Sequence, residues 1–174
     1  ADCQTGLKGG YLPENSYPIH EWQVTAELVE IPNVKMMSIS EATSMITAAG
    51  LTVGEIYYVK SMVTPEEKTV GISAYIGGYV EPLTEIDLFI SKGSDGDGSN
   101  ETPYEIACRE DIEAVNENLD SNYVMCRDIY LGYEKLYSKA VIDANFFEGV
   151  FDGNDFTISN LNIDTNGERV SGIG

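Results

Sequence analysis

The stretch FFEGVFDGNDFTISNLNID, residues 146–164, constrains the fold of this chain more than any other part of its sequence. Its last four apolar residues form two pairs, and one residue separates the members of each pair. Each pair is typical of a very short strand, because side chains at i and i+2 share a face of a strand. Asn160, between the pairs, predicts a corner, since asparagine tolerates left-handed backbone angles. The stretch therefore predicts one rung of a coil, with four inward-pointing side chains in its stacking core: Phe156, Ile158, Leu161 and Ile163.

A second pattern predicts a small α+β domain in residues 31–93. Ser38 and Glu41 form a capping box, in which each side chain satisfies a free amide at a helix start. We therefore expect a helix over residues 39–49 that ends at Gly50. Three runs rich in Ile, Val, Tyr and Phe follow and predict strands: GEIYYVKSM, KTVGISAYI and TEIDLFISKG. One helix packed on a three-stranded sheet is a complete α+β fold.

Residues 31–93 resemble a PASTA domain. The landmarks are an opening Pro-Asn-Val, a Ser-x-x-Glu-Ala helix start, an Ala-Gly-Leu-x-Val-Gly exit and a closing Ser-Lys-Gly, in that order. Three residues depart from the family pattern in surface turns: Met36 and Lys68 stand where the family has glycine, and Tyr75 stands near the usual proline. The resemblance implies one helix on a three-stranded sheet. It also implies a family associated with peptidoglycan fragments and with spacing partner domains.

Residues 104–174 predict a different architecture. The segment TPYEIACREDIEAVNENLDSNYVMCRDIYL indicates a strand, a helix and a strand, because Ile112, Val115 and Leu119 share one helical face. Together with FFEGVFDGNDFTISNLNI and VSGIG, residues 101–174 resemble the start of the GLUG-type repeat region of bacterial surface proteins. The resemblance implies the capped N-terminal end and first rung of a right-handed parallel β-helix.

Two flanking segments complete the organisation. Residues 1–30 form an arm in which HEWQVTAELVEI has strand spacing, and we expect either an edge strand on the next domain or a strand donated to a neighbouring subunit. Residues 94–103 are an acidic, glycine-rich linker. Asp95, Asp97 and Ser99 have the spacing of a calcium loop, but the glycine and glutamate that such a loop needs are missing. A plain linker is therefore expected, and a calcium site is the alternative.

Two of the three cysteines predict a disulfide, provided that the compartment is oxidising. Cys108 and Cys126 bracket the expected helix and strand, and a disulfide between them would contribute roughly 3 kcal/mol by its effect on loop entropy. Two buried free thiols are the alternative. Cys3 is left over, as a lipidated, intermolecularly paired or free residue. The start ADCQTG, with neither an initiating Met nor a leader, resembles an end left by processing, which favours a secreted protein at an extracellular or cell-surface location.

Composition argues against several functions. The chain has 29 acidic and 10 basic residues and a formal charge of −19, mostly from residues after position 93, which repels nucleic acid and anionic lipid. No run is apolar for long enough to cross a bilayer. With one histidine, His20, and neither a nucleophile elbow nor a phosphate loop, we expect no enzyme, no catalytic residue and no cofactor. A ligand or partner surface is predicted at aromatic residues, with plain sheet-surface aromatics as the alternative: Trp22, Tyr57, Tyr58, Tyr75 and Tyr79.

These patterns favour a non-catalytic extracellular structural protein, a self-assembling surface or filament subunit. A coil rung has unpaired edge groups, so an open end at Gly174 would pair with another subunit, through that subunit's residues 1–30, and build a homo-oligomer or polymer. The alternative function is a module that binds peptidoglycan or another cell-wall glycan. A further alternative is the N-terminal part of a longer β-helix adhesin or enzyme.

Overall fold

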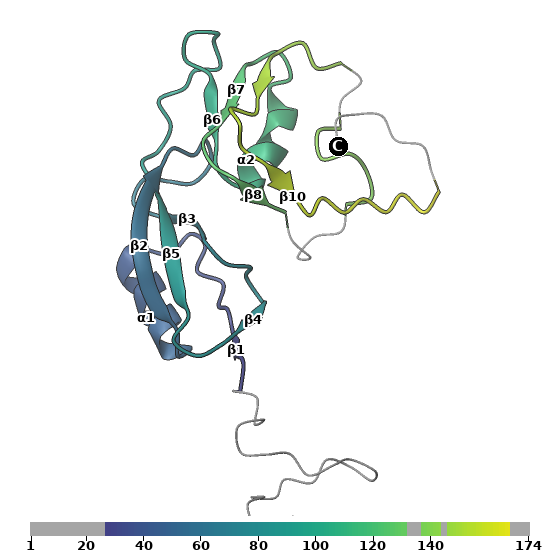
Figure 1. Cartoon of the computed structure of the whole chain (residues 1–174). Coiled ribbons are helices and arrows are strands. Elements are labelled where there is room, and N and C mark those ends of the chain that lie inside the picture. Colours follow the sequence, from purple (N-terminus) through teal and green to yellow (C-terminus); the bar gives the residue numbers. More distant parts are fainter. Residues whose placement is uncertain (1–26, 132–136, 144–145, 168–174) are drawn as a thin grey trace, which may run out of the picture.

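The computed structural model describes residues 27–131, 137–143 and 146–167. Figure 1 shows two folding units that follow one another along the chain. We call residues 27–93 the sheet unit and residues 104–167 the coil unit; the predicted linker, residues 94–103, joins them. Four residues named above lie outside the described residues, with most of the predicted arm: Cys3, His20, Trp22 and Gly174.

The sheet unit is one helix on a three-stranded sheet, in agreement with the sequence pattern. Its strands lie in the order β2 (Thr52–Val59), β5 (Glu85–Ser91) and β3 (Thr69–Ile72), beside the helix α1 (Ile39–Ala48). The central strand β5 is parallel to β2 and antiparallel to β3. A two-residue antiparallel ribbon of β1 (Val29–Glu30) and β4 (Tyr79–Val80) adjoins them. The described end of the N-terminal arm therefore pairs with its own chain.

The helix α1 begins and ends as its sequence predicts. The Glu41 amide donates to the Ser38 hydroxyl at 3.4 Å, and the Ser38 amide donates to the Glu41 carboxylate at 2.8 Å, so both halves of the capping box form. Gly50 follows with φ +83°, the left-handed geometry that favours glycine. Met36 has φ 62°, which explains why a PASTA pattern has glycine at this position. The buried face of α1 shares a core with β5: Ala42, Ile46, Ile86, Leu88 and Ile90.

The coil unit is built from parallel strands that stack between successive turns of the chain, as in a β-solenoid. One stack has the order β6 (Tyr104–Ile106), β7 (Tyr123–Met125) and β9 (Phe151–Asp152). A second stack pairs β8 (Ile129–Tyr130) with β10 (Ile158–Ser159). A parallel bridge between Tyr137 and Ile163 adds a third point of contact. Between β6 and β7 lie the helix α2 (Arg109–Ala114) and the 3₁₀ turn η2 (Val115–Glu117).

An aromatic column runs through the first stack. Tyr104, Tyr123 and Phe151 occupy matching positions on the three strands, and their ring centroids are 5.8 Å and 6.4 Å apart. The Tyr123 hydroxyl donates to the Asn118 carbonyl at 2.6 Å, so this buried phenol is satisfied. Gly149 lies so close to Ser121 that an added Cβ would be 1.7 Å from the Ser121 carbonyl oxygen. Only glycine fits there, which explains the Phe-x-Gly-x-Phe spacing that leads into β9.

The last rung has the predicted corner but is only partly buried. Asn160 has φ 56°, which confirms its expected left-handed conformation. Leu161 and Ile163 pack against the coil core, whereas Phe156 and Ile158 are 38% and 37% exposed. Within the described residues, β10 has a strand neighbour on one side only, so the outer surface of its rung is uncovered.

The carboxylate of Asp111 ties the two units together. It is fully buried, at the third residue of α2, and accepts the amides of Ala107 at 2.8 Å and Cys108 at 3.2 Å. From the sheet unit, the Ser61 hydroxyl donates to it at 2.9 Å and the Val63 amide at 2.8 Å. Burial raises the pKa of the Asp111 carboxyl, and the hydrogen bonds from Ala107, Val63 and Ser61 oppose that rise. One side chain thus caps a helix in the coil unit and holds a loop of the sheet unit.

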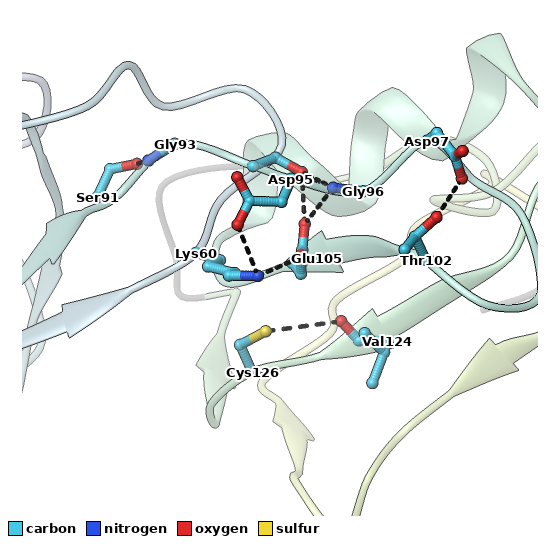
Figure 2. A network of polar contacts seen from close by, with 11 residues as sticks. Lys60, Ser91, Gly93, Asp95, Gly96, Asp97, Thr102, Glu105, Val124 and Cys126 are labelled. Carbon is cyan, nitrogen blue, oxygen red and sulfur yellow. Dashed lines mark hydrogen bonds and ion pairs between the residues drawn. The ribbon is translucent and has the colours of Figure 1, made fainter.

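The predicted linker is ordered by a polar network, shown in Figure 2. Lys60 reaches across from the end of β2 to Glu105 at 3.0 Å and to Asp95 at 3.1 Å. Glu105 also accepts the Ser94 hydroxyl and, at 3.3 Å, the Gly96 amide. Side-chain hydrogen bonds from Thr102 and Ser99 lower the pKa of Asp97 to about 2. Asp95 and Asp97, the carboxylates of the alternative calcium site, are therefore engaged by protein donors. The described residues contain no cluster of three or more metal-binding side chains.

We predict that Asp111→Ala lowers the free energy of unfolding by about 3 kcal/mol or more, because four protein donors lose their acceptor inside the protein. Asp111→Asn should cost less, since one oxygen still accepts. Urea unfolding followed by fluorescence measures both variants. Asp120→Ala removes an exposed carboxylate from the same unit and should change stability by less than about 0.5 kcal/mol. Equal stability of Asp111→Ala and the parent chain would show that the carboxylate does not hold the units.

Candidate ligand-binding cleft between the two folding units

The two faces of the sheet have different partners. Side chains alternate along a strand, so Ile86, Leu88 and Ile90 of β5 point to α1 while Phe89 points the other way. On that second face, Phe89 packs with residues of both units in a small apolar cluster: Val59, Val70, Ala107, Cys108 and Cys126. The coil unit therefore covers part of the sheet face that the helix leaves open.

A cleft opens beside this apolar cluster. Its walls come from both units, so its shape depends on how they are joined. The residues that line it on the sheet side include Lys35, Gly71, Ala74, Tyr75 and Ile76. The coil side contributes Cys108, Arg109, Arg127, Asp128, Ile129 and Tyr130.

Arg127 lines the cleft and packs against an aromatic ring of the sheet unit. Its guanidinium carbon lies 3.6 Å from the centroid of the Phe89 ring, which is a cation–π contact. Gly71 lies opposite Phe89 on β3, and a Cβ there would come within 3.0 Å of the Arg127 Nη1. On the other side of Phe89, the Tyr57 ring stacks at 5.4 Å. Burial lowers the pKa of Arg127 to about 10, opposed by Cys108 and Asp128, so the guanidinium is cationic at neutral pH.

The cleft is basic although the chain is acidic. Three of the 10 basic residues of the sequence line it, with Asp128 as the acidic lining residue. Lys35 forms an ion pair with Glu110 at 3.1 Å, which links the two units again. Asp128 accepts the Thr157 amide at 2.8 Å through one carboxylate oxygen. Such a concentration of cations in a chain with a net charge of −19 favours an anionic or strongly polar ligand.

Two tyrosines meet at the cleft from opposite units. The rings of Tyr75 and Tyr130 have centroids 5.1 Å apart and planes at 63°, an edge-to-face pair. Tyr130, in β8, is 43% exposed. The pair therefore offers aromatic surface next to the cationic groups.

The predicted aromatic surface is not gathered in one place. Tyr75 lines the cleft, whereas Tyr57 stacks on Phe89, Tyr58 lies under the Lys92 ammonium at 5.8 Å, and Tyr79 sits on β4. Sequence reasoning missed Lys35, Arg127 and Tyr130. For Lys35 and Arg127, the one available signal in the sequence was the scarcity of basic residues. No local motif connects them, because they lie in different units.

The expected disulfide between Cys108 and Cys126 is not formed in the structure, where both are free cysteines. The parallel register pairs Ile106 with Met125, so Cys126 lies level with Ala107 rather than with Cys108. The Cys108 sulfur instead lies 3.9 Å from the Thr64 hydroxyl. Burial raises the pKa of both thiols, and it does so strongly for Cys108. Neither sulfur is therefore activated as a nucleophile.

No protein-family model matches the chain, and no curated protein matches it. Solved structures that are similar to it include two from Staphylococcus aureus. One is the three-PASTA-domain of a Ser/Thr kinase, with 21% identity, a TM-score of 0.36 and coverage of 60% of this chain and 51% of that chain. The other is the entire extracellular region of the Ser/Thr kinase PrkC, with 18% identity, a TM-score of 0.36 and coverage of 75% and 48%. The chain thus spans about half the length of each. Among its described residues, no helix has the length and hydropathy to cross a membrane.

We predict that both thiols are free in solution. Iodoacetamide at pH 8 should label Cys108 far more slowly in the folded chain than in urea, because burial disfavours its thiolate. Peptide mapping after unfolding without reductant should find both Cys108 and Cys126 alkylated. A peptide in which the two residues are linked would contradict the structure.

Proposed function

We propose that this chain is a non-catalytic, extracellular module that binds a cell-wall glycan, and that the cleft between the units holds the ligand. The observation that carries the proposal is the Tyr75–Tyr130 pair beside Arg127. Ligand sites favour domain interfaces and combine aromatic area with a few polar groups that orient the ligand. Tyrosine suits such a site because its ring covers an apolar face while its hydroxyl stays hydrogen-bonded.

The sequence supports the cell wall as the source of the ligand. Residues 31–93 resemble the PASTA family, which is associated with peptidoglycan fragments. The chemistry of the cleft supports binding over catalysis. Burial raises the pKa of its one thiol, Cys108. Among the described residues that line the cleft, there is no histidine that could act as a general base for this thiol.

We predict that Tyr75→Ser and Tyr130→Ser each reduce retention on purified cell wall by about tenfold, the loss expected when an aromatic contact of roughly 1.4 kcal/mol is removed. Retention by the parent chain should persist at 0.5 M salt, because stacking does not depend on ionic strength. The measurement is a sedimentation assay with quantified bound protein.

Tyr79→Ser is the matched control. Tyr79 is 64% exposed on β4 and does not line the cleft, so its removal should leave retention unchanged. Equal losses for all three variants, or no retention of the parent chain, would contradict a binding role for the cleft.

A second candidate function is assembly through the coil. It is favoured by the edge position of β9 and β10 in their stacks and by the partly exposed apolar side chains of the last rung, Phe156 and Ile158. Unpaired strand edges of this kind accept another strand. The occupant would be a second copy in a filament or surface array, or further rungs of the same polypeptide in a longer adhesin or enzyme.

For assembly through this edge, we predict that the 174-residue chain forms concentration-dependent oligomers and that the double variant Phe156→Asp, Ile158→Asp abolishes them by placing charges at the contact. Light scattering after size exclusion gives the mass across a dilution series. Leu83→Asp, at a residue that is 76% exposed in the sheet unit, is the control and should leave the oligomers intact. A monomer at every concentration would exclude self-assembly by this edge.

A further inference from the structure

We infer that the cleft selects glycans that carry a carboxylate, and that the Arg127 guanidinium binds this group. The inference rests on the proposed function, because it takes the cleft as the glycan site. It adds the chemical class of the ligand and the residue that recognises it.

The first argument is the state of the Arg127 donors. Arginine has five N–H donors at the edge of a planar group. Phe89 contacts the face of that plane, at 3.6 Å from the guanidinium carbon to the ring centroid, and leaves the edge donors unused. Within residues 27–131, 137–143 and 146–167, the guanidinium has no hydrogen bond or ion pair with a protein acceptor. Asp128 is close enough to interact by charge, but its carboxylate accepts the Thr157 amide.

The second argument is the fixed orientation of the side chain. Phe89 lies against one part of the guanidinium and the backbone of Gly71 against another, where a Cβ would be 3.0 Å from Nη1. Phe89 is itself backed by Tyr57. A guanidinium held in this way loses little conformational freedom on binding, which is the advantage of a preorganised site.

The third argument concerns which anion fits. Two parallel N–H groups of a guanidinium match the two oxygens of a carboxylate in one plane. The net charge of −19 repels a dianion about twice as strongly as a monoanion at a distance, so it disfavours phosphate. Lys35 is already paired with Glu110. Arg109 also lines the cleft but is buried, with 8% exposure, so Arg127 is the cation available to a single negative charge. Tyr75 and Tyr130 line the same cleft and supply surface for the sugar ring.

The test compares ligands that differ only in charge. We propose calorimetric titration of the full chain with a disaccharide that ends in glucuronic acid, with its methyl ester and with inorganic phosphate. The acid should bind at least about tenfold more tightly than the ester, as expected for a charge-assisted bidentate pair. Tighter binding of phosphate than of the acid would overturn the assignment of a carboxylate.

The variants locate the effect. Arg127→Gln should abolish the preference for the acid, and Arg127→Lys should keep part of it, because an ammonium retains the charge but not the fork. Lys92→Gln removes the same charge outside the cleft, where Lys92 lies over Tyr58, and should keep the full preference. Circular dichroism establishes that each variant is folded. If Arg127→Gln does not fold, the acid-to-ester ratio of the parent chain and of Arg127→Lys decides the question.

The outcomes separate this inference from the proposed function. Equal affinity for the acid and the ester, with both lost in Tyr130→Ser, would overturn the carboxylate assignment and leave the cleft as a glycan site. Absence of binding for both sugars, together with no retention on cell wall, would overturn both. A preference for the acid that survives in Arg127→Gln would show that another cation carries it.

Discussion

The relative position of the two units depends on the hydrogen bonds of the buried Asp111 carboxylate. A carboxylate without water is costly unless protein donors replace the lost hydration. Here the donors come from both sides: Ala107 and Cys108 at the start of α2, and Ser61 and Val63 in the loop after β2. Because the donors from both units must converge on two oxygens, the position of one unit relative to the other is narrowly defined.

The apolar contact between the units cannot do this alone. The shared cluster contains small side chains such as Val70, Ala107 and Cys108, and apolar contacts do not specify direction. Three polar contacts lie around this cluster and fix the orientation of one unit relative to the other: Asp111–Ser61, Lys60–Glu105 and Lys35–Glu110. The cleft follows from this joint, since Tyr75 and Tyr130 meet only when the units are so placed.

Local patterns predicted the parts of the fold that local physics determines. The capping box at Ser38 begins α1, runs rich in Ile, Val, Tyr and Phe form β2, β3 and β5, and the corner at Asn160 has the expected backbone angle. Failures occurred where distant residues decide the outcome. The disulfide was inferred from the short spacing of the cysteines and from the secreted character of the chain. Both thiols are free, and the register of β6 and β7, which pairs Ile106 with Met125, places Ala107 level with Cys126. The linker looked featureless because the partner that orders it, Lys60, lies in the sheet unit.

The same reasoning explains why the candidate site was only partly predictable. Tyr75 drew attention as one of several tyrosines, but nothing in the sequence distinguishes it from Tyr79 until Tyr130 is placed beside it. In the sequence, Arg127 stands beside an aspartate, as many surface arginines do. Its role depends on its contact with Phe89 and on the lack of a side chain at Gly71. In a chain with a surplus of carboxylates, most cations are expected to form ion pairs. A cation without a protein acceptor is therefore the more informative sign of a ligand site. Among the described residues, Lys60 and Lys35 have carboxylate partners, whereas Arg127 and Lys92 lie against aromatic rings. Of these last two, Arg127 is the one that lines the cleft.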